Sequence, residues 1–215
     1  MTTAAEVEIP VDEVVLRGDL VIPQGAGGVV AFAHGSGSSR LSPRNRFVAA
    51  TLNQAGVGTL LMDLLTRDEE LEDSVTGKLR FDIGLLAERL IAAVDWLRAG
   101  AAASHPLGLF GASTGAAAAL VAAAERPDDV AAVVSRGGRP DLAGDALPRV
   151  RAPTLLIVGS LDHLVLELNE QALGLLRAEK ELAVVPGATH LFEEPGTLEE
   201  VARLATEWFV RHLAA

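Results

Sequence analysis

One serine lies in the pattern that a nucleophilic hydroxyl requires. Gly111-Ala-Ser-Thr-Gly115 has the form G-x-S-x-G and separates an apolar run, residues 107–110, from an alanine-rich run, residues 116–124. A tight turn between a strand and a helix projects the serine hydroxyl clear of the sheet, and the two glycines remove side chains that would collide with neighbouring backbone. Because G-x-S-x-G also occurs by chance, the motif alone is equally compatible with a small-residue turn that packs a helix on a strand. Ser113 is therefore a candidate nucleophile that needs a base and an acid.

An acid and a histidine follow two later apolar runs. Asp162 lies in Gly159-Ser-Leu-Asp162 after residues 154–158, and His190 lies in Gly187-Ala-Thr-His190 after residues 182–185. Loops at the carboxyl ends of parallel strands carry the active residues of α/β sheets. The order Ser113, Asp162, His190 is the order of one particular class of serine hydrolase. His163 is the rival base, but its position next to Asp162 makes contact with both that carboxylate and the serine awkward.

A nucleophilic mechanism also needs donors for a developing oxyanion. The N–H of Thr114 follows the serine directly, and the run 29–33 leads into the turn His34-Gly-Ser-Gly-Ser-Ser39. We predict the backbone N–H groups of Thr114 and Ser36 as the oxyanion hole, where one donor is typically worth a factor of ~10²–10³ in rate. We interpret His34 as a hydrogen-bonded residue that braces this loop.

The elements that must position these residues alternate along the chain. Short apolar runs predict strands at 7–10, 14–22, 29–33, 58–62, 107–110, 131–135, 154–158 and 182–185. Most are apolar on both faces, which is typical of a parallel sheet covered by helices on both sides, and the first two predict an antiparallel edge hairpin. Helices are predicted at 44–54, 83–97 and 116–124, and Thr197-Leu-Glu-Glu200 predicts a capping box at the start of the last helix. We expect an α/β fold that forms a single domain, 1–215.

Composition excludes several function classes. The chain has no Cys, and Lys+Arg 18 against Asp+Glu 29 gives a formal net charge of −11. Thiolate metal sites, disulfides and a cysteine nucleophile are therefore excluded, and a nucleic-acid partner is disfavoured. Glycines 35 and 37 do not complete G-x-G-x-x-G, because Arg40 occupies the third glycine position. We expect no cofactor and no metal.

Segments that could direct the chain to a membrane are not apparent. The first residues carry acids where a signal peptide needs positive charge, and the uncharged stretch 99–124 is interrupted by His105-Pro106 and several glycines. We expect a cytoplasmic monomer or homodimer whose partner is a small-molecule substrate, with no nucleic acid and no membrane.

The oxyanion loop 34–39, the turn that carries Ser113 (the nucleophile elbow), the acid and the histidine each follow a different strand, in the expected order. With these four features the sequence resembles the α/β-hydrolase family, in its lidless dienelactone-hydrolase-like branch. The resemblance spans nearly the whole chain and rests on His34-Gly35 and the three motifs that contain Ser113, Asp162 and His190. It implies a three-layer α/β-hydrolase fold with a mostly parallel eight-stranded sheet, and a hydrolase that cleaves small esters or lactones through an acyl-enzyme. Dienelactone hydrolases have a cysteine at the elbow, so Ser113 favours serine-esterase chemistry instead. The alternative is a catalytically silent module of the same fold that serves binding or regulation.

Three further features concern the substrate. Residues 136–152 leave no room for a cap domain after the sixth strand, which predicts a shallow, open pocket. In this segment Arg136 and Arg139 are tentative ligands for a substrate carboxylate, with a loop salt bridge to Asp141 as the alternative. Asp141 is also the fallback triad acid, since some family members place the triad acid after the sixth strand.

The acidic stretch 64–82 is predicted to be a solvated loop without the spacing of a calcium site. It is also a candidate flap beside the pocket.

Overall fold

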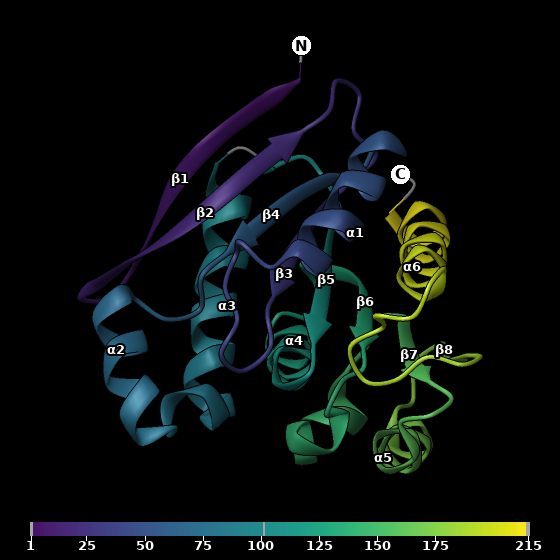
Figure 1. Ribbon diagram of the computed structural model, residues 1–215. Coiled ribbons are helices and arrows are strands. Elements are labelled where there is room, and N and C mark those ends of the chain that lie inside the picture. Colours follow the sequence, from purple (N-terminus) through teal and green to yellow (C-terminus); the bar gives the residue numbers. More distant parts are fainter. Residues whose placement is uncertain (1, 101, 214–215) are drawn as a thin grey trace.

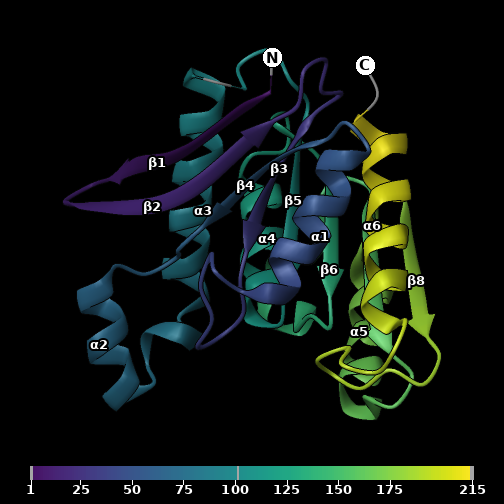
Figure 2. The same ribbon diagram turned by 45° about the horizontal axis from the view of Figure 1, so that its top comes forward.

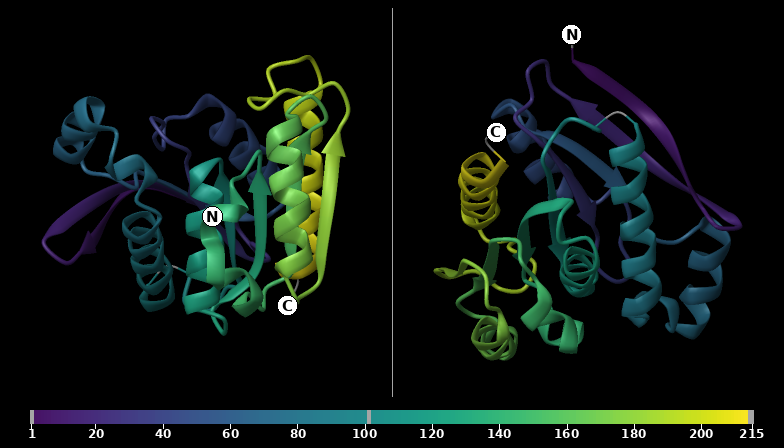
Figure 3. Two further views of the ribbon diagram at one scale, coloured as in Figure 1. Left: turned by 90° about the horizontal axis from the view of Figure 1, so that it is seen from below. Right: turned by 180° about the vertical axis from the view of Figure 1, so that it is seen from behind.

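A computed structural model, which describes residues 2–100 and 102–213, places all the predicted strands in one eight-stranded sheet (Figure 1). The strands are β1 (Thr3–Val11), β2 (Val14–Ile22), β3 (Val29–Ala33), β4 (Gly58–Met62), β5 (Leu107–Ala112), β6 (Val130–Arg136), β7 (Thr154–Gly159) and β8 (Lys180–Val185). Their order across the sheet is β1-β2-β4-β3-β5-β6-β7-β8. β2 pairs antiparallel with β1 and β4, and the remaining neighbours pair in parallel. The prediction of a mostly parallel sheet with an antiparallel hairpin is confirmed, and the hairpin and β8 form opposite edges (Figure 3).

Helices cover both faces of the sheet. They are α1 (Pro43–Gln54), α2 (Arg67–Thr76), α3 (Ile83–Ala99), α4 (Thr114–Glu125), α5 (His163–Leu175) and α6 (Thr197–Leu213), with 3₁₀ segments η1 (Leu79–Phe81) and η2 (Pro140–Arg149). α1 and α6 pack on one face, and α3, α4 and α5 pack on the other (Figure 2). Each face therefore has its own hydrophobic core, and strands β3, β4, β5 and β7 are buried along their whole length. This double coverage is the reason for their continuous apolar sequences.

The acidic stretch 64–82 differs from its prediction. It is not a solvated loop: it contains α2 and η1, and α2 stands outside the layers of the sheet (Figure 1). Thr66 and Glu69 form a capping box, in which the Glu69 N–H donates to Thr66 Oγ1 at 3.2 Å and the Thr66 N–H donates to Glu69 Oε2 at 2.7 Å. An ion pair of 2.8 Å joins Glu69 to Arg89 of α3. Caps and ion pairs, rather than an apolar face, hold this helix in place.

Two other expectations concern α6 and the segment after β6. The predicted capping box at Thr197 is wrong: Thr197 Oγ1 donates to the carbonyl of Glu194 at 2.7 Å, and the Glu200 carboxylate pairs with Arg203.

After β6 the chain reaches β7 through η2 alone, so no cap domain lies there. None of the helices within the described residues combines the length and the apolar character needed to cross a bilayer.

Candidate active site

Ser113 occupies a strained turn between β5 and α4. Its backbone has φ 51° and ψ −121°, a region that side chains rarely adopt. A Cβ at Gly111 would overlap the backbone of Ala116, and a Cβ at Gly115 would overlap the carbonyl of Ala33 on β3. The two glycines of the motif therefore allow α4 to approach β5 and β3 closely enough to hold the serine in this turn.

Asp162 and His190 meet at the carboxyl ends of β7 and β8. His190 Nδ1 lies 2.6 Å from Asp162 Oδ2, and the histidine side chain keeps 40% of its surface exposed. Hydrogen bonds between the two loops fix this contact: the N–H of Leu161 donates to the carbonyl of Ala188 at 3.0 Å, and the N–H of Gly187 donates to Ser160 Oγ at 2.8 Å.

The alternative acid and the alternative base lie in other contacts. Both oxygens of Asp141 accept from the guanidinium of Arg139, at 2.9 and 2.7 Å. This is the loop salt bridge that the sequence offered as the second interpretation of Arg139. His163 is exposed at the start of α5, whereas the carboxylate of Asp162 contacts His190. The geometry thus favours Asp162 and His190 as the acid–base pair.

The loop after β3 lies against the turn that carries Ser113. Ser36 Oγ lies 3.0 Å from Thr114 Oγ1, and a Cβ at Gly35 would lie 3.0 Å from the Cβ of Ser113. Among the described residues, neither the N–H of Ser36 nor that of Thr114 has a hydrogen-bond acceptor. Two free N–H groups beside the serine are the donors that an oxyanion requires.

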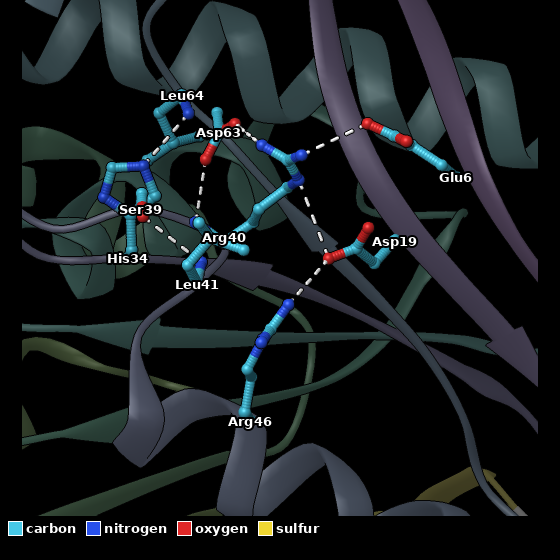
Figure 4. Close-up of polar contacts among 9 residues, drawn as sticks. All are labelled: Glu6, Asp19, His34, Ser39, Arg40, Leu41, Arg46, Asp63 and Leu64. Carbon is cyan, nitrogen blue, oxygen red and sulfur yellow. Dashed lines mark hydrogen bonds and ion pairs between the residues drawn. The ribbon is translucent and has the colours of Figure 1, made fainter.

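Asp63 and Leu64, which follow β4, hold both ends of this loop (Figure 4). At one end, the Leu64 N–H donates to His34 Nε2 at 3.0 Å, while His34 Nδ1 lies 3.0 Å from the carbonyl of Gly35. At the other end, the N–H of Arg40 donates to Asp63 Oδ1 at 2.8 Å and its Nη1 donates to Oδ2 at 2.6 Å. Burial lowers the pKa of His34, so the ring is neutral near pH 7 and accepts through Nε2. The prediction that His34 braces the loop agrees with these bonds.

The guanidinium of Arg40 extends this anchor to the edge hairpin. Its Nη2 donates to Glu6 of β1 at 3.2 Å, and its Nε lies 3.6 Å from Asp19 of β2, which Arg46 also contacts at 3.5 Å (Figure 4). Two carboxylates from the hairpin strands and one from the residue after β4 therefore surround one loop arginine. In the sequence, Arg40 stands out only as the residue that breaks a glycine motif, and nothing there predicts this anchor.

A small cavity joins the elbow to the histidine. Its volume is about 240 Å³, and Ser113, His190 and Arg136 line it together with Arg44 and Asn45 of α1. Arg136 Nη2 donates to Asn45 Oδ1 at 3.2 Å, and burial, followed by the charge of Arg44, lowers the pKa of Arg136 to about 10. The sequence predicted Arg136 near the site but gave no signal for Arg44 or Asn45, because their position depends on how α1 packs.

A larger cavity of about 720 Å³ lies on the other side of the oxyanion loop. It shares Gly35 and Ser36 with the small cavity and extends over Leu64 and Leu86 toward α2. Within residues 2–100 and 102–213, no cluster of three or more His, Asp or Glu side chains is arranged to hold a metal ion.

Comparisons with known proteins agree with this fold. The family model described as the dienelactone hydrolase family matches residues 16–213. A crystal structure of a dienelactone hydrolase from Anabaena variabilis is 60% identical, with a TM-score of 0.96, over 98% of each chain. Est1E from Butyrivibrio proteoclasticus shares the fold at 18% identity, with a TM-score of 0.82, over 98% of this chain and 99% of its own.

A curated relative has a different kind of name. It is a putative phosphoribosyl transferase from Mycobacterium tuberculosis, 58% identical over 209 residues. The match covers 97% of this chain but 46% of the relative, so the chain spans about half the length of the curated relatives it matches.

Proposed function

The chain belongs to the dienelactone hydrolase family, and we propose that it is a serine hydrolase that cleaves a small carboxylic ester or lactone through an acyl-enzyme. The family and the solved relative support a hydrolase. One observation carries the finer proposal: His190, held by Asp162 at 2.6 Å, shares a cavity with Ser113 on its strained turn. A serine, a base and an acid gathered at one cavity are the groups that activate a hydroxyl once the base comes within hydrogen-bond reach of it.

In the first half-reaction, Ser113 Oγ attacks the carbonyl carbon of the substrate and His190 Nε2 takes its proton. Nε2 is available for this step because Nδ1 faces Asp162. Asp162 fixes the tautomer and stabilises the imidazolium that forms. The negative charge on the carbonyl oxygen is stabilised by the N–H groups of Ser36 and Thr114, which have no other acceptor among the described residues.

The tetrahedral intermediate then collapses. The bond to the leaving oxygen breaks, and His190 returns the proton to that oxygen, which leaves Ser113 acylated. For a lactone the leaving hydroxyl stays attached to the acyl group. In the second half-reaction His190 takes a proton from water, the hydroxide attacks the acyl carbon, and Ser113 Oγ leaves with the proton from His190. The shared cavity admits water to this position because His190 is partly exposed.

The name of the mycobacterial relative does not change this proposal. More than half of that protein lies outside the match, whereas the dienelactone hydrolase model accounts for residues 16–213 of this chain. Ser113, Asp162 and His190 are residues of the types that acyl transfer requires.

An activity-based probe tests the proposed function. A fluorophosphonate labels a serine only when its hydroxyl is activated, so we expect labelling of the wild type at neutral pH and none of Ser113→Ala. Ser104→Ala, at an exposed serine remote from the cavity, is the matched control and should label normally. A panel of short-chain aryl esters, lactones and thioesters then identifies the bond that is cleaved. Absence of labelling in the folded wild type would favour the silent module of the same fold.

A further inference from the structure

The side chains of Ser36 and Thr114, whose N–H groups are the proposed oxyanion donors, are joined in a chain of hydrogen bonds. Ser36 Oγ lies 3.1 Å from the carbonyl oxygen of Arg80 and 3.0 Å from Thr114 Oγ1. A carbonyl oxygen can only accept, so the single hydrogen of the Ser36 hydroxyl is donated to Arg80. The Thr114 hydroxyl then donates to Ser36 Oγ. The chain therefore has one direction, and it ends on the backbone of η1.

The middle of the oxyanion loop has few other restraints. Its two ends are held by the contacts drawn in Figure 4. Between them, among the described residues, the backbone donates one hydrogen bond, from the Ser38 N–H to the carbonyl of Gly35 at 3.2 Å. Gly37, with φ 67°, adds backbone freedom to this segment. The contact that restrains Ser36 itself is thus its side-chain bond to Arg80, although an oxyanion donor acts only when it is accurately placed.

The carbonyl of Arg80 is held in place by Asp73, a carboxylate near the end of α2 whose residue is 3% exposed. Its Oδ1 accepts from the N–H of Leu79 at 2.7 Å and from the N–H of Arg80 at 3.2 Å. Its Oδ2 accepts from Arg80 Nε at 2.5 Å, and Arg80 Nη2 donates to the carbonyl of Asp73 at 2.8 Å. Both the backbone and the side chain of Arg80 are therefore fixed on α2.

Helix α2 is in turn fixed on the body of the fold by polar contacts. Glu69 forms the capping box with Thr66 and pairs with Arg89 of α3. The apolar residues Leu71 and Val75 of this helix are exposed, and α2 stands outside the layers of the sheet (Figure 1). Because α2 adds little to the core, its ordered position calls for another explanation, and its contact with the oxyanion loop supplies one.

We propose that Asp73 and Arg80 position the oxyanion hole: they hold the Ser36 hydroxyl, and through it the two N–H donors. This inference rests on the proposed function of Ser113. Asp73 and Arg80 line the larger cavity but not the small one that Ser113 shares with the histidine, so they are positioning residues that act through Ser36. The acidic segment 64–82 thus supports the oxyanion hole from outside the sheet.

Ser36→Ala tests the centre of the chain, because it keeps the N–H donor and removes the hydroxyl that orients it. The substrate is 4-nitrophenyl acetate, a small neutral ester suited to the cavity of about 240 Å³. We expect kcat to fall by about tenfold or more with little change in KM, since a fully placed donor is worth ~10²–10³ in rate. Ser104→Ala, at an exposed serine that lines neither cavity, is the control and should keep the wild-type kcat. An unchanged kcat in Ser36→Ala would refute the proposal.

A double-mutant cycle tests whether the support comes from α2. Asp73→Asn removes the charge that holds Arg80 and should lower kcat by about threefold or more. Because both residues act through one hydrogen bond, the double variant with Ser36→Ala should lose little more than Ser36→Ala alone. Asp95→Asn is the matched control, since Asp95 makes a similar two-bond pair with Arg126 and lines neither cavity, and kcat should not change. Losses that multiply would show that Asp73 acts by another route and would overturn its assigned role. Arg80→Met replaces Asp73→Asn in the cycle if that variant does not fold.

An inhibitor that forms an oxyanion separates positioning of the hole from general damage. With trifluoroacetone, Ser113 Oγ adds to the carbonyl carbon, His190 takes the hydroxyl proton, and the carbonyl oxygen becomes the oxyanion. The inhibition constant should rise in Ser36→Ala and in Asp73→Asn by the same factor by which kcat/KM falls. An unchanged inhibition constant beside a reduced kcat would show that the hydroxyl does not act on the oxyanion, and the proposal would be wrong.

Hydrogen exchange provides a readout that does not depend on turnover. The amides of Ser38 and Arg40 are hydrogen-bonded in the loop, and they should exchange faster in Ser36→Ala and Asp73→Asn than in the wild type and Asp95→Asn. Absence of fluorophosphonate labelling would refute the serine mechanism, and the exchange rates would still decide whether α2 holds the loop. Normal labelling with unchanged exchange and unchanged kcat would refute the support and leave the serine hydrolase intact.

Discussion

The strained turn at Ser113 predicts that the protein becomes more stable when its candidate nucleophile is replaced by glycine. Ser113 has φ 51° and ψ −121°, where a Cβ is unfavourable and glycine is not. Ser113→Ala and Ser113→Gly both remove the hydroxyl, but only the glycine variant also removes the Cβ. The difference between the two therefore isolates the strain from the loss of the nucleophile.

The expected difference follows from two opposing terms. A residue held in such a region costs about 1–3 kcal/mol, and this is released in Ser113→Gly. Glycine loses more backbone freedom on folding than alanine, which returns about 0.5–1 kcal/mol. The net advantage of Ser113→Gly over Ser113→Ala is therefore about 0–2.5 kcal/mol in the free energy of unfolding. Its central value of about 1 kcal/mol corresponds to about 2–4 °C in melting temperature for a chain of this size.

Thermal melts and urea titrations of the two variants measure this difference directly. Ser74, on the exposed side of helix α2, is the matched control: there glycine should be less stable than alanine by about 1 kcal/mol. Opposite signs at the two positions would show that the effect belongs to the turn. If glycine is less stable than alanine at position 113 by as much as it is at position 74, the turn stores no strain and the steric argument for the elbow is wrong.

Three further predictions concern residues around the serine. Asp162→Asn should lower kcat for a neutral aryl ester by about 10³-fold or more, because His190 loses the partner that fixes its tautomer, and a loss below tenfold in steady-state kinetics would contradict this. Burial lowers the pKa of His34 in the folded protein, so as the pH falls below the usual value of 6.5 the histidine is protonated first in the unfolded chain. The free energy of unfolding should therefore decrease below that pH, and it should decrease less in His34→Gln. Urea titrations between about pH 5 and 8 measure both. Arg40→Met should free the oxyanion loop and lower kcat by about tenfold or more with little change in KM, whereas an unchanged kcat would show that the loop keeps its position without this anchor.

Apolar patterning carried most of the fold prediction. Strands buried on both faces have sequences that admit few other interpretations, so the sheet and its edge hairpin followed from the sequence. Parallel strands bring their carboxyl ends to one edge, which is why the sequence predicts that Ser113, Asp162 and His190 lie near one another. Their roles in catalysis stay predictions.

Helix α2 was missed because its stability does not come from an apolar face. Leu71 and Val75 are 62% and 87% exposed, so no buried periodicity marks the helix. A local signal was nevertheless present: Thr66 and Glu69 have the spacing of a capping box, which the structure contains. The same spacing at Thr197 forms no such box, because the Glu200 side chain pairs with Arg203 instead. Whether a Thr-x-x-Glu spacing forms a capping box therefore depends on the charged side chains near its glutamate.

Arg44 and Asn45 show a different limit of sequence reasoning. They lie in the first turn of α1 and reach the cavity only because α1 packs beside the carboxyl ends of the strands. Hydrophobic periodicity predicts which face of a helix is buried, but not which neighbour its polar end meets. The anionic composition of the chain also pointed away from them, since a net charge of −11 gives no sign of a cationic cavity.

Two features of this site reduce the stability of the fold, and both concern the same small cavity. Ser113 is held in a strained turn, and the fall in the pKa of Arg136 to about 10 corresponds to about 3 kcal/mol against its charged form in the folded protein. A glycine would adopt the turn without strain, and an uncharged side chain at position 136 would leave no charge to bury. Strain and unpaired charge that concentrate around one cavity are the usual cost of function. This coincidence is the physical reason to look for the reacting carbonyl of the substrate in this cavity.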